Sequence, residues 1–211
     1  MTIMNLLLRG GILMYVLVVV SIAVLAIVLE KYRQVSRLRK ANEKLRYYLA
    51  QQDKLDNIRA VLRIHGLSSP LGMMLDKLYN SQTEDIRLIE NSMESTANLE
   101  LHKLEKGMGW LATLSAIAPL IGFLGTVVGM VSVFMNIQGQ GQNSVDINTL
   151  AGGIWQALLT TVGGLAVGIP AIIFHNDLVE HMANIAKEMQ NQAIEHEIKY
   201  QKALGRELQR P

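Results

Sequence analysis

The sequence predicts an all-α membrane protein with three transmembrane helices, of which the second and third extend into a cytoplasmic helical bundle. Half of the 211 residues are hydrophobic, yet only 5% are aromatic, so the apolar content is mainly aliphatic. Charged residues are missing between Arg9 and Glu30, between Lys106 and Asp146, and between Asp146 and Asp177. Each gap is long enough for the about 20 apolar residues that cross a bilayer. This distribution excludes a soluble globular protein.

The chain contains no cysteine. A disulfide-stapled secreted domain, a Cys-ligated metal site and a cysteine nucleophile are therefore excluded. The sequence has no nucleotide-binding loop, and its net charge of +2 does not indicate a nucleic-acid partner. We therefore expect no cofactor, no metal and no enzymatic activity.

The predicted spans divide the chain into seven segments. They are the N-terminal segment 1–10, the spans Gly11–Leu29, Met108–Met135 and Leu150–Phe174, the region 30–107, the loop 136–149 and the tail 175–211. Fourteen of the 20 Lys and Arg residues lie in the region 30–107 and five in the tail, whereas the loop has none. Because basic residues near span ends favour the cytoplasmic side, we expect the region and the tail to be cytoplasmic and the N-terminus to lie outside.

A cleaved signal peptide is the alternative interpretation of the first apolar segment. However, its basic residues follow the apolar run, the run is too long for such a peptide, and no small-residue cleavage site closes it. We therefore expect an uncleaved first span.

The cytoplasmic segments are predicted to be helical almost throughout. Lys31–Ile64 contains neither Gly nor Pro, and Ser69 followed by Pro70 is typical of a helix start. The run Ser81-Gln82-Thr83-Glu84 fits a capping box. Since nothing interrupts the helical pattern from there to the second span, we expect one rod of about 50 residues. Apolar residues at helical spacing after the third span predict that its helix also continues into the cytoplasm.

Two stripes of small and hydroxyl-bearing residues run along the second and third spans. They comprise Ser115, Pro119, Gly122, Thr126, Gly129 and Val133 in the second span, and Gly153, Ala157, Thr160, Thr161, Gly164 and Gly168 in the third. Such stripes let membrane helices approach closely. Packing between helices is enough to explain a small or hydroxyl-bearing residue at any single position. The two long stripes together favour closely packed helices that line a common axis.

Pro119 and Pro170 interrupt these spans, and each frees a backbone carbonyl one turn earlier. A freed carbonyl in a membrane needs a neighbouring group or water as its partner. We therefore expect both prolines to face protein or a wet cavity, although a kink without functional meaning is the alternative.

No Asp, Glu, Lys, Arg or His lies inside a predicted span. A proton or ion relay across a bilayer generally needs a titratable group. If this chain takes part in ion conduction, the carboxylate must therefore come from another polypeptide.

Two long motifs resemble the MotA/TolQ/ExbB proton-channel family. Ala118–Phe134 is similar to its second-span signature, and Gly153–Ala171, followed by Asn176, is similar to its third-span signature. The apolar run from Gly10 to Glu30 is similar to the family's first span. Three spans and a sizeable cytoplasmic region resemble the TolQ/ExbB branch, in particular ExbB, rather than the four-span flagellar stators.

The resemblance implies a homopentamer in the bacterial inner membrane, with its N-terminus in the periplasm and its C-terminus in the cytoplasm. The second and third helices would line a pore around ExbD/TolR-like single-span partners, each of which brings a membrane Asp. By motif position, Thr126 and Thr161 match hydroxyls along the ion path, with Thr160 as a neighbour. Further pore-facing or helix-packing positions are Ser115, Pro119, Gly122, Gly129, Gln156, Gly164 and Pro170.

One position departs from the family pattern, because many TolQ/ExbB members have Glu where this chain has Gln156. The main hypothesis is a pore-forming motor subunit driven by the proton-motive force, and the alternative is a non-conducting membrane scaffold. A solute transporter fits poorly, since the spans carry no charge and no inverted repeat. The sequence leaves open whether H⁺ or Na⁺ flows, and whether import or envelope maintenance is driven.

Overall fold

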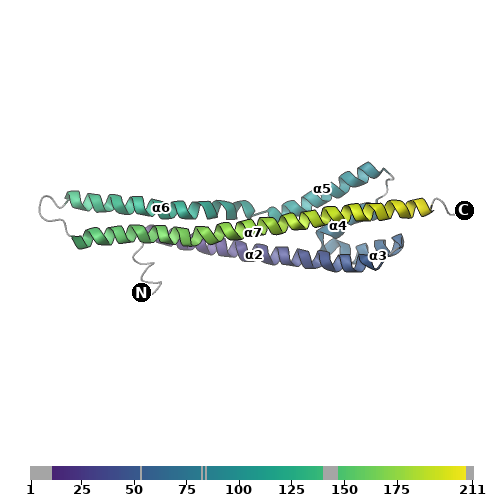
Figure 1. Cartoon of the computed structure of the whole chain (residues 1–211), viewed down its shortest axis with the longest axis horizontal. Helices are drawn as coiled ribbons and strands as arrows, with labels where there is room; N and C mark the ends of the chain where they lie inside the picture. The colour runs from purple at the N-terminus through teal and green to yellow at the C-terminus, as the bar shows by residue number, and fades with distance from the viewer. Residues whose placement is uncertain (1–10, 53, 82, 84, 140–146, 208–211) are drawn as a thin grey trace. The chain divides into compact units, whose positions relative to one another are not determined.

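The computed structural model describes residues 11–52, 54–81, 83, 85–139 and 147–207. All regular elements among these residues are helices (Figure 1). They are α2 (Ile12–Ala50), α3 (Leu55–His65), the 3-10 helix η1 (Gly66–Ser68), α4 (Pro70–Tyr79), α5 (Ile86–Glu105), α6 (Met108–Gly139) and α7 (Ile147–Glu207). Three of the described helical segments are long and apolar enough to cross a membrane. The predicted all-α class with three such segments is therefore confirmed.

The chain divides into two compact units. The apolar unit comprises the described parts of Met1–Leu29 and Gly107–Asp177, and the charged unit those of Glu30–Lys106 and Leu178–Pro211. Helices α2 and α7 contribute residues to both units.

The predicted rod through the second span is wrong, because α5 and α6 are separate helices. Lys106 leaves the helical conformation with ψ 122°, and Gly107 has φ +93°. Glycine adopts a positive φ without the steric cost that a Cβ brings. Gly107 was therefore the sequence signal for this break.

The predicted helix over Lys31–Ile64 is also interrupted, since α2 ends at Ala50 and α3 begins at Leu55. In the charged unit, α3 contacts α4 and buries Ile58 and Leu62. Burial of these two residues is a tertiary contribution that local helix propensity does not include, so the sequence pattern predicts no turn here.

Two predicted helix starts have different outcomes. Ser69 caps α4, because its side chain accepts a hydrogen bond from the Gly72 N–H at 3.0 Å, and Pro70 is the first helical residue. Gln82 and Glu84 of the predicted capping box lie outside the described residues. The described helix α5 begins later, at Ile86, with Asp85 accepting from the Arg87 N–H at 3.0 Å.

In the apolar unit, α6 and α7 approach each other closely along their glycines. A Cβ atom added to Gly122 would lie 2.9 Å from the Thr160 carbonyl oxygen, and one added to Gly164 would lie 2.6 Å from that of Ala118. Real Cβ atoms essentially never lie so close to backbone atoms. These two positions therefore require glycine, and we call the contact that they form the glycine seam.

The glycine seam continues in both directions from Gly122 and Gly164. Gly125 faces Thr160, Gly129 faces Ala157, Gly153 faces Val133 and Gly168 faces Pro119. The two stripes predicted from the sequence thus lie against each other within one chain. The first turns of α2 complete the packing, because Met14 and Leu17 are buried in one cluster with Ala118.

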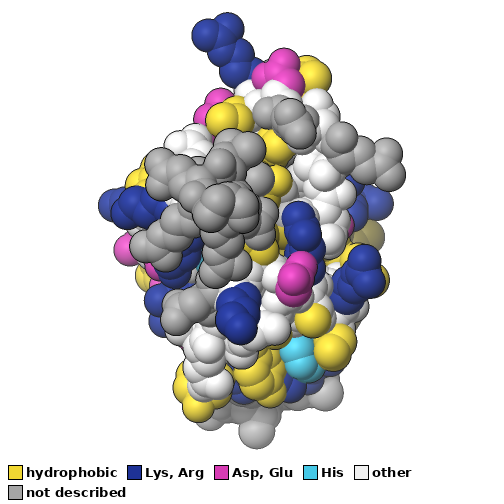
Figure 2. Space-filling view, turned by 90° about the vertical axis from the view of Figure 1, so that its right-hand side faces the viewer, with side chains coloured by type: hydrophobic (Ala, Val, Ile, Leu, Met, Phe, Trp, Pro, Cys, Tyr) yellow, Lys and Arg dark blue, Asp and Glu magenta, His cyan; other side chains and the backbone are white. Residues whose placement is uncertain are grey.

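The outer face of the apolar unit is covered by large apolar side chains. On α6, Leu120, Phe123 and Phe134 are all exposed within the single chain. An extended apolar surface of this kind is typical of contact with lipid or with another protein. By contrast, the face shown in Figure 2 carries Lys and Arg interspersed with Asp and Glu.

A buried lysine ties α2 to the end of α5 within the charged unit. Lys31 is 5% exposed, and its Nζ atom donates to the Leu104 carbonyl at 3.0 Å and to Gln34 Oε1 at 2.9 Å. Burial lowers the pKa of the Lys31 ammonium group, and the charge of Glu30 partly opposes this shift. Because Leu104 lies in the last turn of α5, the ammonium group caps a helix end that prefers positive charge.

A second buried polar pair ties α4 to α7. The Tyr79 hydroxyl lies 2.8 Å from His196 Nδ1, and the two residues are 1% and 3% exposed. Burial lowers the pKa of His196 to about 4, the Lys199 charge lowers it further, and Glu195 opposes the shift. Burial likewise raises the pKa of the Tyr79 hydroxyl. The pair is therefore neutral at physiological pH.

The low pKa of His196 predicts a loss of stability in acid. The unfolded chain takes up this proton near pH 6.5, whereas the folded chain does so only near pH 4. Stability is therefore fully present above pH 6.5 and falls by about 2–3 kcal/mol as the pH drops to 4. We expect His196→Gln to remove this component when thermal unfolding is followed by circular dichroism across the pH range. The same pH dependence in both proteins would contradict the assignment.

The glycine seam predicts a sharp difference between two Gly→Ala substitutions in α7. Gly164→Ala should lower the free energy of unfolding by about 1–3 kcal/mol, because the new methyl group must push the helices apart. Gly152→Ala is the matched control, since a Cβ there would meet nothing within 4 Å. It should be neutral or stabilising by up to about 1 kcal/mol. Thermal unfolding in detergent measures both, and equal effects would refute the close contact.

Candidate functional site

Two threonine hydroxyls of α7 converge on one carbonyl of α6. Thr161 Oγ1 donates to the Gly122 carbonyl oxygen at 3.0 Å. Thr160 Oγ1 donates to the Ala157 carbonyl at 2.7 Å and lies 3.4 Å from the same Gly122 oxygen. Because Gly122 has no side chain, its carbonyl is open to these hydroxyls. The glycine seam therefore positions both threonines.

The two threonines differ in exposure. Thr160 is 1% exposed, whereas Thr161 is half-buried. The family resemblance places Thr161 on the ion path with Thr160 as a neighbour, and within one chain the Thr160 hydroxyl is enclosed between the two helices. Thr161 is therefore better placed to meet a group outside the chain.

Thr126 lies one helical turn from this contact. In an α-helix, its backbone N–H bonds to the carbonyl of the residue four positions earlier, which is Gly122. The Thr126 side chain is half-buried, and its hydroxyl donates to the Phe123 carbonyl at 2.7 Å. The structure thus brings the region of Thr126 close to Thr161, although the two hydroxyls use different carbonyls.

These hydroxyls can solvate either form of a carboxyl group. With its hydrogen given to a carbonyl, a hydroxyl still offers oxygen lone pairs to a protonated acid or to a water molecule. After rotation, the same hydroxyl can donate to a carboxylate. Thr126 and Thr161 can therefore stabilise an acid through a cycle of proton uptake and release without carrying charge themselves.

The two prolines have different surroundings. The Pro119 ring faces Gly168 in the seam, where a Cβ would lie 2.5 Å from the Pro119 Cγ atom. The Ser115 carbonyl freed by Pro119 lies against the same glycine, and the buried Ser115 hydroxyl donates to the Ala112 carbonyl at 2.8 Å. Pro170 is exposed within the single chain. Pro119 therefore belongs to the helix contact and Pro170 does not.

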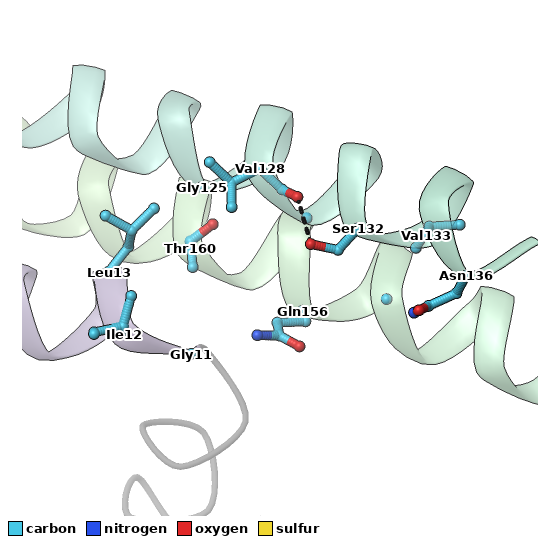
Figure 3. A pocket seen from close by; sticks show the side chains of 12 residues that line it. Gly11, Ile12, Leu13, Gly125, Val128, Ser132, Val133, Asn136, Gln156 and Thr160 are labelled. Carbon is cyan, nitrogen blue, oxygen red and sulfur yellow. Dashed lines mark hydrogen bonds between the residues drawn. The ribbon is translucent and has the colours of Figure 1, made fainter. Parts of the chain in front are cut away.

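A cavity of about 360 Å³ lies where α2, α6 and α7 meet (Figure 3). Its polar lining comes from Ser132 and Asn136 on α6 and from Gln156 and Thr160 on α7. Gln156 also reaches the start of α2, because a Cβ on Gly11 would lie 2.5 Å from Gln156 Nε2. Gln156 of α7 thus lies against the backbone at Gly11, directly before α2.

Asn136 joins this group although the sequence pattern places it outside the predicted span. It lies one residue beyond the predicted end of the second span, at Met135, and is the first residue of the predicted loop 136–149. The helix in fact continues to Gly139. The spacing of Gly129, Ser132 and Asn136, which places them on one helix face, was the signal that could have found it.

Metal ligands are not clustered in the part of the chain that the structure describes. No group of three or more His, Cys, Asp or Glu residues that could hold a metal ion occurs among those residues. The polar atoms that form the candidate site are neutral hydroxyl, amide and carbonyl groups.

Comparison with known proteins places these features in a family. The sequence profile of the MotA/TolQ/ExbB proton channel family matches residues 54–191. An ExbB-like biopolymer transport protein of Synechocystis sp. is 33% identical over 177 residues, which cover 82% of this chain and 68% of that protein. The biopolymer transport protein ExbB of Neisseria meningitidis is 29% identical, covering 77% of this chain and 78% of its own length.

A shorter similarity links the chain to the Tol-Pal system protein TolQ of Haemophilus influenzae. It is 37% identical over 87 residues, which cover 41% of this chain and 37% of that protein. The family profile covers well over half of the chain, and it includes all of α6 and the glycine seam. With its three apolar helices, the chain is a multi-pass membrane protein that belongs to the MotA/TolQ/ExbB proton channel family.

Proposed function

We propose that the chain is the pore-forming subunit of an inner-membrane motor driven by the proton-motive force. The observation that carries this proposal is the convergence of Thr160 and Thr161 on the Gly122 carbonyl, one turn from Thr126. These hydroxyls are held at fixed positions on two packed helices. They can therefore hydrogen-bond to an acidic group of another polypeptide that carries protons along the path. The names of the relatives, which refer to biopolymer transport and the Tol-Pal system, favour a role in envelope transport or maintenance.

The proposed motor needs an acid from a second polypeptide. The predicted spans contain no Asp, Glu, Lys, Arg or His, and charge inside a bilayer is expensive unless a specific group carries it. We propose an ExbD/TolR-like partner with one membrane span and one Asp in that span. Five copies of this chain would surround it, with the N-terminus in the periplasm and the C-terminus in the cytoplasm.

In this mechanism the partner's Asp meets Thr161 and Thr126 in turn. The hydroxyls accept a hydrogen bond from the protonated acid and donate one to the carboxylate, so that both forms are solvated. Thr160 holds the helix contact while Thr161 and Thr126 provide the ion path. Movement of one component against the other would then transmit force towards the periplasm or the outer membrane.

The non-conducting scaffold is retained as a second candidate because of one observation. Thr160 is almost fully buried and its hydroxyl is satisfied within the chain, as expected for a residue that only packs helices. A scaffold would keep its function after collapse of the proton gradient, whereas the motor would lose it.

Removal of the Thr161 hydroxyl tests the ion path. Thr161→Val should slow ion-driven activity about 10- to 100-fold, because a hydrogen bond to a charged group is worth about 1.5–3 kcal/mol. Thr161→Ser should restore most of the rate, since it returns the hydroxyl. Proton flux into vesicles that contain the purified complex measures the effect, and co-purification of the partner confirms assembly.

Thr113→Val is the matched control for this experiment. Thr113 is exposed on α6, and its hydroxyl donates to the Gly109 carbonyl at 2.8 Å, away from the seam. We expect this variant to retain normal flux. Normal flux in Thr161→Val and Thr126→Val, with the complex intact, would contradict the ion-path assignment.

The chain alone should not conduct protons selectively. Vesicles that contain this chain without a partner should show a proton leak no greater than empty vesicles, because no acid is available to carry the charge. The leak is measured with a pH-sensitive dye trapped inside the vesicles after an imposed pH step. A robust and selective leak from the chain alone would show that it needs no external carboxylate.

A further inference from the structure

The cavity between α2, α6 and α7 extends deep along α6. Its lining runs from Asn136 at one end to Gly125 at the other. These residues are 11 positions apart in the sequence, which corresponds to about 16 Å along the helix axis. The hydrocarbon core is about 30 Å thick, so the cavity spans about half of that distance.

The polar groups in the cavity are incompletely satisfied. The Ser132 hydroxyl donates to the Val128 carbonyl at 3.0 Å, as Figure 3 shows. By contrast, the Asn136 and Gln156 side chains are exposed within the single chain, and their amides form no hydrogen bond with another residue that the structure describes. Each amide offers two donors and an acceptor. In a membrane, such exposed amides need water or another polar partner, because an amide without one in an apolar environment is unfavourable.

From this geometry, we infer that the cavity is a water chamber within each subunit, with its polar end at Asn136 and its inner end at Thr160. A water molecule needs at least about 10–15 Å³ and two to four polar partners, and 360 Å³ holds a cluster of them. The two amides and the Ser132 oxygen supply the partners. Among the residues that the structure describes, the lining contains no acid or base, which favours neutral water over a fixed ion.

Water in the chamber would also reach the glycine seam. Thr160 lines the inner end of the cavity and also approaches the Gly122 carbonyl that Thr161 uses. Water in the chamber therefore lies one residue from the proposed ion path. The role of this water in proton supply rests on the proposed function, whereas its presence does not.

The absence of cysteine from the sequence allows a direct test of the water chamber. Val128 lines the cavity, and Val127 is its neighbour at the same depth on another face of α6. The two side chains are similarly exposed within the chain, at 49% and 44%. Val128→Cys and Val127→Cys therefore form a matched pair that differs in access to the cavity.

The probe is a charged methanethiosulfonate, which reacts with the thiolate that forms in water. In native membranes that hold the full complex, we expect Val128→Cys to react at least tenfold faster than Val127→Cys. Adding Ser132→Leu, which fills the cavity with an apolar side chain, should slow the reaction of Val128→Cys at least tenfold. It should leave the rate of Val127→Cys unchanged.

Two outcomes would overturn the inference. An unreactive Val128→Cys would show that the cavity is dry, and a reaction that Ser132→Leu does not slow would show that the thiol is reached from elsewhere. Because the readout is thiol modification and not ion flux, a failed ion-path assignment at Thr161 leaves this test intact. A dry cavity would likewise leave the Thr161 experiment unaffected.

Discussion

The close approach of α6 and α7 at Gly122 and Gly164 is the constraint on which the rest of the apolar unit depends. A membrane offers no hydrophobic driving force between helices, so association relies on van der Waals packing and on interhelical hydrogen bonds. Both require short distances between backbones, and here a single added methyl group would collide with a carbonyl oxygen. The same proximity lets Thr161 bond to Gly122, so the packing and the candidate site have one cause.

The polar groups of the apolar unit are neutral. In the proposed function they interact with a carboxyl group that another polypeptide supplies. Hydroxyls at the seam and amides in the cavity can orient water or an acid, but none of them titrates in the physiological range. Such a lining avoids the desolvation cost of a permanent charge in the bilayer. Gln156 fits this pattern, because it provides an uncharged amide beside Gly11.

The charged unit is held by a different kind of contact. Lys31 caps α5, and the neutral Tyr79–His196 pair links α4 to α7. Both are buried polar contacts between residues far apart in the sequence, and removing one partner would leave the other unsatisfied. They join the short helices α4 and α5 to the long helices α2 and α7.

The sequence by itself determined the helical class, the three apolar segments, the start of α4 at Ser69 and the two small-residue stripes. Each of these follows from periodicity or from local backbone chemistry within a few residues. Tertiary structure decided the turn after Ala50, the enclosure of Thr160 and the grouping of Asn136 with Gln156. These features depend on the register between α6 and α7 or on burial against other helices. A pattern along one helix cannot specify which residues it meets on the next.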